Sequence, residues 1–257
     1  MDLSTFKNDE EIVQYLEAQL DKINTLNECR LFREEQMQLS EKILNFRNCI
    51  EWIIRSNQVI TNIKYALTKC LKYAVNMASP LEETENKKLY SYYLEDTVYR
   101  DLVLWDMFRQ LLNEFYKCGY SETENISIFK FIRENKSKIG DTKANDLLTY
   151  LNSSDHKHVR ETLRHSFTHS IEATSPYIFH RNINGKIQTQ MEYMFPSHPF
   201  ENLNYVLKDV LKLIDFLNEI VKDMYEYRND NFILLEIVAI MPCGKKVDDS
   251  SYWNLGI

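Results

Sequence analysis

The chain has 257 residues, of which only five are glycine and five are proline, and 44% are hydrophobic. So few turn-forming residues predict long helices, and this hydrophobic content excludes a chain that is disordered throughout. The formal net charge of −7 argues against a protein that coats nucleic acid or an anionic membrane non-specifically, while leaving room for a local basic site.

No targeting or membrane segment is visible in the sequence. The N-terminal residues lack a basic region followed by an apolar stretch, and no window reaches the roughly 18 uncharged apolar residues of a membrane span. The five cysteines are far apart and form no C-x-x-C pair, which favours reduced thiols. We therefore expect a cytoplasmic protein without a membrane partner.

The first third of the chain has the periodicity of helices. A first helix is expected over residues 10–23, capped by Asn8 or Asp9. Apolar stripes at helical spacing then run from about residue 31 to 77. The polar stretch that begins at Ser56 is a candidate boundary between two helices within this run.

The middle of the chain predicts a buried helix and two shorter ones. Residues 81–88 are expected to form a charged connection, and a helix rich in bulky apolar residues follows at 96–120, with Gly119 as its C-terminal stop. The shorter helices are expected at 126–136 and 142–151.

The last third changes character. A serine or aspartate at residues 153–155 can cap a helix, and the Asn184-Gly185 pair between alternating residues predicts a β-hairpin. A long helix is expected over residues 201–227, whereas 232–242 fits either a strand or a buried helical turn.

These elements predict one mainly all-α domain over residues 1–257, an elaborated helical bundle with one small β-hairpin insertion. The sequence contains no P-loop, dinucleotide fingerprint or G-x-S-x-G motif. Nucleotide sites that depend on glycine-rich loops are therefore not expected, and we expect no cofactor.

The segment RETLRHSFTHS, residues 160–170, lies in a histidine-rich part of the chain, since four of the six histidines fall within 156–169. On a straight α-helix the apolar residues of this segment share one face. The polar residues fall on the opposite face, so their histidines should face solvent, a cleft or a partner. The apolar face comprises Val159, Leu163, Phe167 and Ile171, and the polar face comprises Arg164, Glu161, Thr168, His165, His158 and His169.

Three interpretations of the polar face compete. It can be simply a solvated helix surface. His165 and His169 at i, i+4 could share a metal ion, but no glutamate follows His165, and the cationic Arg164 would repel the metal. The third interpretation, which we favour, is metal-free chemistry on a phosphodiester. Arginine offers a permanently charged fork for phosphate, and histidine can transfer a proton near neutral pH.

Arg164-His165-Ser-Phe-Thr-His169, with Leu163 before it and Ser170 after it, resembles the R-x4-6-H motif of the HEPN domain superfamily, and most closely its Cthe-type branch. Members of that superfamily are helical bundles, commonly homodimers, and many are metal-independent ribonucleases in toxin–antitoxin and phage-defence systems. The resemblance covers residues 96–227, on which N-terminal helices over 8–78 would pack.

The resemblance implies that His169 is the acid–base group, that Arg164 stabilises charge on the phosphate, and that His165 assists. Lys157 and Arg160 would guide the RNA backbone. Arg160 and His165 also satisfy the spacing. The later pair is preferred because a helix-start context, a polar second residue and an all-helical chain coincide there.

The expected function is thus an endoribonuclease that acts on RNA, with a possible cognate antitoxin as protein partner. Ile171 stands where many antitoxin-controlled members carry a modified tyrosine, which puts that mode of control in doubt. The alternative is a non-catalytic module of the same fold that dimerises or binds RNA or protein.

Overall fold

The structure is a computed structural model, which describes residues 2–27, 41–77, 84–121, 123–164, 177–183, 186–192 and 198–231. Several features singled out from the sequence lie outside these residues. They include His165, Phe167, Thr168, His169, Ile171, the Asn184-Gly185 turn, residues 232–242, Cys29 and Cys243.

Helix α1 (Asp9–Leu20) follows a short 3₁₀ turn, η1 (Leu3–Thr5). The Asn8 side chain accepts a hydrogen bond from the Glu11 amide at 3.0 Å, which confirms Asn8 as the cap. The acidic residues of the first turn lie at the positive end of the helix dipole, where they stabilise the helix.

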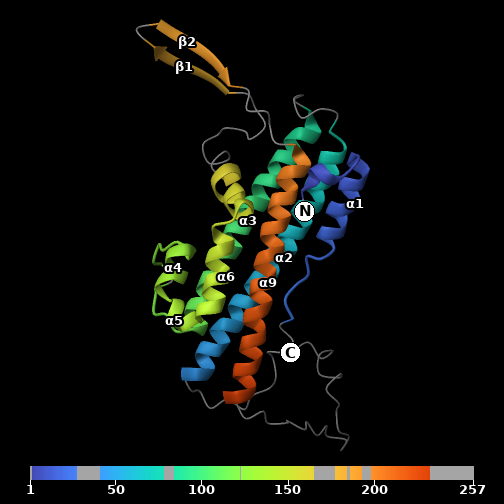
Figure 1. Cartoon of the computed structure of the whole chain (residues 1–257). Helices are drawn as coiled ribbons and strands as arrows, with labels where there is room; N and C mark the ends of the chain where they lie inside the picture. The colour runs from blue at the N-terminus through green and yellow to red at the C-terminus, as the bar shows by residue number, and fades with distance from the viewer. Residues whose placement is uncertain are drawn as a thin grey trace, which may run out of the picture.

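Helices α2 (Glu41–Val75) and α3 (Glu85–Phe115) are long neighbours that pack along each other in opposite directions (Figure 1). Helix α2 runs without a break through Ser56, so the expected boundary there is wrong. Helix α3 begins at Glu85 and not at residue 96 as expected, because the Thr84 side chain accepts from the Lys87 amide and caps the helix there.

Three short helices lie beside α3 and α9: α4 (Ile128–Glu134), α5 (Lys136–Ile139) and α6 (Asp141–Leu151). Both expected helices of this region are present, as α4 and α6. Gly140, with φ of 98°, makes the sharp turn between α5 and α6 that a residue with a Cβ would adopt only with strain.

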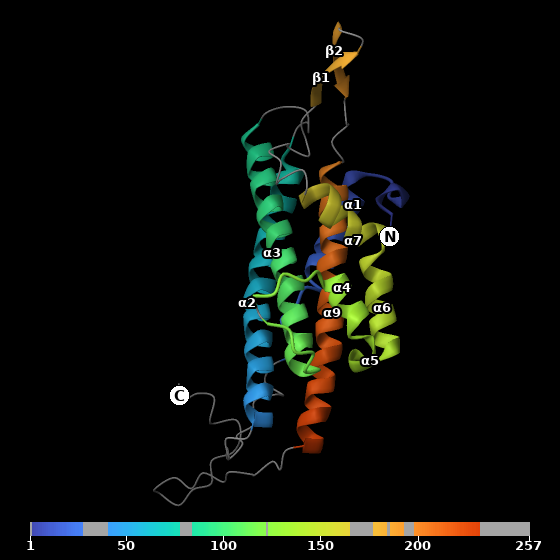
Figure 2. The ribbon, with the colours of Figure 1, turned by 90° about the vertical axis from the view of Figure 1, so that its left-hand side faces the viewer.

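After α6 the chain forms α7 (Ser154–Lys157) and, continuous with it, the π-helical segment η3 (His158–Leu163). Beyond these come strands β1 (Tyr177–Ile183) and β2 (Lys186–Glu192), which pair antiparallel from Tyr177 opposite Glu192 to Ile183 opposite Lys186. The two strands extend from one end of the bundle (Figure 2).

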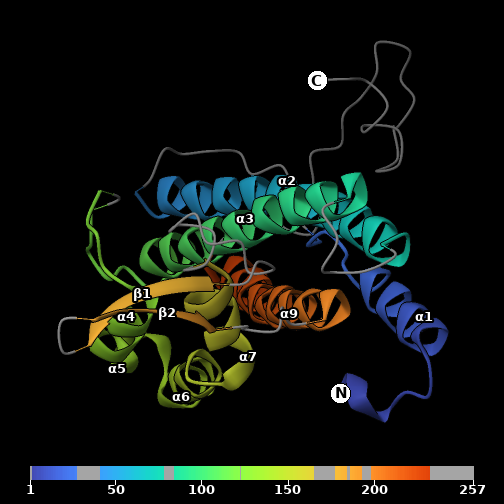
Figure 3. The same cartoon turned by 90° about the horizontal axis from the view of Figure 1, so that it is seen from above.

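Helix α9 (Pro199–Asn231) is the central element. It lies between the α2–α3 layer and the side formed by α6 and α7 (Figure 3) and contacts helices of both. Its apolar face is buried with Trp105 and Phe108 of α3 and with Leu16 of α1. The expected all-α helical bundle is confirmed, and none of the described helices has the length and apolar character of a transmembrane span.

Candidate functional site

The histidine-rich segment is held against the bundle at its N-terminal end, which is the part that the structure describes. Ser153 caps α7, its hydroxyl accepting from the His156 amide at 3.3 Å, within the 153–155 range expected from the sequence. Val159 and Leu163 are fully buried, which confirms the apolar stripe over this stretch. The segment therefore enters the candidate site with one face fixed in the core.

The polar residues of the segment are not arranged as a straight α-helix would place them. Residues of η3 follow the wider π-helical path, and the Arg164 amide donates to the Val159 carbonyl, five residues back. The projection of 100° per residue used for the sequence is therefore wrong between His158 and Leu163. Single-turn π-helical stretches of this kind occur frequently at functional sites.

His158 packs against α9. Its Nε2 lies 3.2 Å from the Asn202 Oδ1, and its ring stacks on Tyr205 with 4.1 Å between ring centroids. The expectation that His158 faces away from the bundle is wrong. Among the described residues no group of three His, Cys, Asp or Glu side chains is positioned to hold a metal ion, and His165 and His169 lie outside them.

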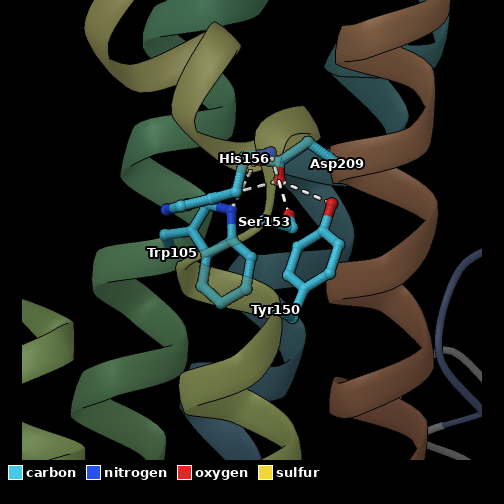
Figure 4. A network of polar contacts seen from close by, with 5 residues as sticks. All are labelled: Trp105, Tyr150, Ser153, His156 and Asp209. Atoms are coloured by element: carbon cyan, nitrogen blue, oxygen red, sulfur yellow. Dashed lines mark hydrogen bonds and ion pairs between the residues drawn. The ribbon is translucent and has the colours of Figure 1, made fainter.

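His156 belongs to a buried polar network centred on Asp209 of α9 (Figure 4). The His156 Nδ1 lies 2.9 Å from Asp209 Oδ1, and the Tyr150 hydroxyl donates to the same oxygen at 2.8 Å. The Trp105 indole N–H donates to Asp209 Oδ2 at 2.9 Å. Asp209 is 0% exposed and His156 2% exposed. These four residues, which we call the Asp209 anchor, join α3, α6, α7 and α9 at one point.

A second carboxyl group, Asp101 of α3, is buried beside the anchor at 0% exposure. Burial and the charge of Asp209 raise the pKa of Asp101 well above its usual value. No described donor reaches either oxygen of Asp101, so the ionised form would be unsatisfied. The neutral acid, in contrast, can donate a hydrogen bond to the neighbouring Asp209.

Asp209 keeps its negative charge because its neighbours stabilise the ionised form. Burial by itself would raise its pKa, but the hydrogen bond and charge of His156, together with hydrogen bonds from Asp101 and Trp105, lower it below the usual value. The two carboxyl groups therefore divide the roles of acid and base at one buried site.

The cationic residues of the segment differ in exposure. Arg160 is half-buried, and its pKa is lowered by burial and by the charge of Arg164, while Asp209 and Asp101 act in the opposite direction. Arg160 thus lies within electrostatic reach of the buried acids. Lys157 and Arg164 are exposed. Of the two overlapping arginine–histidine pairs, only the one that starts at Arg164 begins with an exposed arginine.

The anchor was not identified from the sequence, although one signal was present. Asp209 stands among the apolar residues of α9, flanked by Val206, Leu207 and Val210, all fully or nearly fully buried. A carboxylate at such a position has to be paired, since an isolated buried charge is too costly. His156, which sequence analysis grouped with the other histidines, is its partner.

A family model of Cthe2314-like HEPN domains matches residues 52–229, from within α2 to near the end of α9. No curated protein and no solved structure matches the chain. The match covers more than half of the chain, including the segment around Arg164 that carries the R-x4-H motif. The chain belongs to the Cthe2314-like HEPN family.

Proposed function

We propose that this HEPN protein is a metal-independent endoribonuclease whose catalytic groups are Arg164 and His169, assisted by His165. The observation that carries the proposal is the position of Arg164. It is exposed, and it directly follows a segment whose other face is fixed in the core by Val159 and Leu163. In a HEPN family member, the arginine of an R-x4-H motif held in this way is suited to bind a phosphodiester.

The chemistry requires two groups. His169 takes the proton of a ribose 2′-hydroxyl as that oxygen attacks the adjacent phosphorus, and the bond from phosphorus to the 5′-oxygen breaks as this oxygen takes a proton from water. The guanidinium of Arg164 stabilises the charge that develops on the phosphate oxygens. The products are a 2′,3′-cyclic phosphate and a 5′-hydroxyl, and the bond changes need neither a metal ion nor a cofactor.

The two flanking cations take different roles in this proposal. Lys157 is exposed one and a half to two turns before Arg164 and can contact the RNA backbone. Arg160 is half-buried close to Asp101 and Asp209. We therefore assign Arg160 to the electrostatic balance of the buried acids, and not to the guidance of RNA that the resemblance implied.

HEPN domains often bind RNA and act as dimers, and we propose both for this chain. A homodimer would bring two copies of the segment into one composite cleft. We also propose a single domain over residues 1–257, with α2 added to the core at 96–227 because the family match begins at residue 52. In this domain β1 and β2 form a hairpin insertion. A cytoplasmic toxin–antitoxin or phage-defence setting, with a cognate antitoxin, completes the proposal.

The test is cleavage of mixed RNA in the presence of EDTA. We expect the wild type to cleave, His169→Ala to lower kcat by about 10²- to 10⁴-fold, and Arg164→Ala to lower it by about 10²- to 10³-fold. His198→Ala removes an exposed histidine outside the motif and should cleave like the wild type. The 3′ ends of the products should carry a cyclic phosphate.

Two outcomes would count against the proposal. If His169→Ala cleaved as fast as the wild type, the site assignment would be wrong. If no variant cleaved and light scattering showed that Arg164→Ala separates a dimer, the alternative of a non-catalytic dimerisation module would be supported instead.

A further inference from the structure

A cluster of tyrosines lies on the side of α2 and α3 that faces away from α9. Tyr65 of α2 is 58% exposed and Tyr92 of α3 is 63% exposed. Tyr93 contacts both, with ring centroids 6.5 Å from Tyr65 and 5.2 Å from Tyr92, and Tyr73 stacks on Tyr93 at 5.8 Å. The half-buried Tyr73 and Tyr93 thus support two tyrosines that are largely exposed.

The same part of α2 is basic within an acidic protein. Glu51 is the last acidic residue of α2, and the remainder of the helix carries the cations Arg55, Lys64, Lys69 and Lys72. The Lys69 Nζ lies 5.2 Å from the centroid of the Tyr65 ring. Lys64 donates to the Ile23 carbonyl at 3.0 Å, whereas Lys72 is exposed.

These side chains border a shallow groove of about 400 Å³ along α2, lined by Thr61, Lys64, Tyr65, Thr68, Lys69 and Lys72. None of its lining residues is acidic. A groove with lysines along it and open aromatic rings beside it matches the alternation of phosphates and bases in a single strand.

We propose that this tyrosine–lysine surface, formed by Tyr65, Tyr92, Tyr93, Lys69 and Lys72, binds single-stranded RNA. Bases stack on Tyr65 and Tyr92, and phosphates pass over Lys69 and Lys72. The choice of RNA as the ligand rests on the proposed function, but the binding itself does not require cleavage. Stacking on tyrosine tolerates any base, so the surface contributes affinity without sequence preference.

The charge of the surface disfavours a second copy of the chain as its occupant. A two-fold symmetric contact would place Lys69 and Lys72 of one copy near the same lysines of the other, with no acidic residue of α2 between them. On α3 the carboxylate of Asp96 is paired with Arg100 at 2.8 Å. Glu95 stands three residues after Tyr92 on the same helix, so its negative charge is expected near Tyr92, and we place the phosphates over α2.

The surface and the proposed catalytic segment lie towards the same end of the bundle. Tyr73 is near the end of α2 and Tyr92 is near the start of α3, at the end of the bundle where α9 begins (Figure 1). The Tyr90 hydroxyl donates to the Pro199 carbonyl at 2.9 Å, which joins the starts of α3 and α9. Segment η3 contacts both of these helices.

The experiment measures binding of a fluorescein-labelled 2′-O-methyl oligouridylate to the full chain by fluorescence anisotropy. The methylated 2′-oxygen prevents cleavage by the proposed route. The test variants are Tyr65→Leu, Tyr92→Leu and the pair Lys69→Gln with Lys72→Gln. The matched control is the pair Lys130→Gln with Lys222→Gln, two exposed lysines on α4 and α9 whose removal changes the net charge equally.

Each tyrosine variant should weaken binding by about 5-fold or more, the loss expected for one stacked base. The lysine pair should also weaken binding and reduce the slope of log K against log salt by up to about 1.4, because two phosphate contacts are lost. The control pair should bind like the wild type. Thermal melting should show all variants folded, since the substituted side chains are largely exposed.

The proposal is overturned if the test variants bind RNA as the control pair does. It is equally overturned if Tyr65→Leu or Tyr92→Leu changes the oligomeric state but leaves RNA binding unaltered, because the surface would then join two copies. If the test variants lose RNA binding and even the wild type shows no EDTA-resistant cleavage, the result would support this surface. The same result would contradict the proposed ribonuclease.

Discussion

Asp101 and Asp209 occupy neighbouring buried positions, yet they bind protons differently. Trp105, Tyr150 and His156 lie within hydrogen-bonding distance of the Asp209 carboxylate, whose pKa is lowered. No described donor reaches the oxygens of Asp101, and burial raises its pKa and favours its neutral form. Both are 0% exposed. The stability of the protein should therefore depend on pH through these two residues with opposite signs.

Asp101→Asn should stabilise the protein at neutral and alkaline pH. Folding raises the pKa of Asp101 above its value in the unfolded chain, which is about 3.9. The contribution of wild-type Asp101 to stability is therefore complete below about pH 3.9, and it is lost as the pH rises towards the pKa of the folded state. Asparagine is neutral at every pH and can still donate to Asp209. A gain of about 1 kcal/mol would raise Tm by about 2–4 °C.

The measurement is Tm by differential scanning fluorimetry between about pH 4 and about pH 8. The difference between Asp101→Asn and the wild type should widen with pH and nearly vanish at the acidic end. Asp215→Asn, which changes an exposed carboxylate of α9, is the control. A lower Tm for Asp101→Asn at alkaline pH would mean that Asp101 is ionised and serves as an ion-pair partner.

Asp209 contributes in the other direction. Its pKa is lowered on folding, so its contribution to stability is complete above its unfolded pKa and is lost as pH falls through the folded value. The anchor should therefore weaken under acid conditions. Since the anchor joins α7 to α9, the loss of charge on Asp209 would release the start of the segment that leads to Arg164.

At the scale of the elements, helices with a continuous apolar stripe could be predicted from the sequence. Helix α9 was expected at 201–227 and observed as Pro199–Asn231, and the caps at Asn8 and Ser153 were expected correctly. These features depend on local periodicity and local hydrogen bonds, which are encoded within a few neighbouring residues.

The break expected in α2 failed for a tertiary reason. The Ser56 hydroxyl donates back to the Trp52 carbonyl at 2.8 Å, and the Asn57 side chain binds both the amide and the carbonyl of Leu26. Ser56 is thus satisfied within its own helix, and Asn57 stands in the interior of the helix because it binds a distant segment. The π-helical turn and the Asp209 anchor escaped prediction similarly, since each depends on packing against α9.

Asn57→Leu should uncouple the segment after α1 from α2. The Leu26 amide and carbonyl, now bound at 2.7 and 3.2 Å, would lose their partner in a buried site. We expect the free energy of unfolding to fall by about 2 kcal/mol or more, as measured by urea denaturation. Asn62→Leu, an exposed substitution one and a half turns later, should change it little. Equal stabilities of the two variants would contradict this role for Asn57.

At the scale of the whole molecule, the candidate site could be only partly predicted and only partly located. The sequence suggested Arg164 and the HEPN family, and the family match bears out the latter. Exposure separates Arg164 from Arg160, which spacing alone could not do. His165 and His169 lie outside the described residues, so their roles stay predictions for the cleavage assay.

The proposed composite cleft can be tested by mixing two inactive copies. Arg164→Ala and His169→Ala chains, co-expressed with different tags and purified through both, form a mixed dimer. If one cleft contains both motifs, the mixed dimer retains one arginine and one histidine, and we expect it to regain measurable RNA cleavage. Either variant alone should remain inactive. A mixed dimer that does not cleave would mean that each copy uses only its own motif.

Segment η3 also affects how relatives of this chain should be aligned. A π-helical turn contains one residue more than the α-helical turn it replaces, while the chain enters and leaves along the same axis. A relative whose segment is wholly α-helical would present the same arginine with one residue fewer before it. We therefore expect alignments of the family to need a single-residue gap between His158 and Leu163. The number of residues between two positions on either side of that gap should differ by one between members that share the same site.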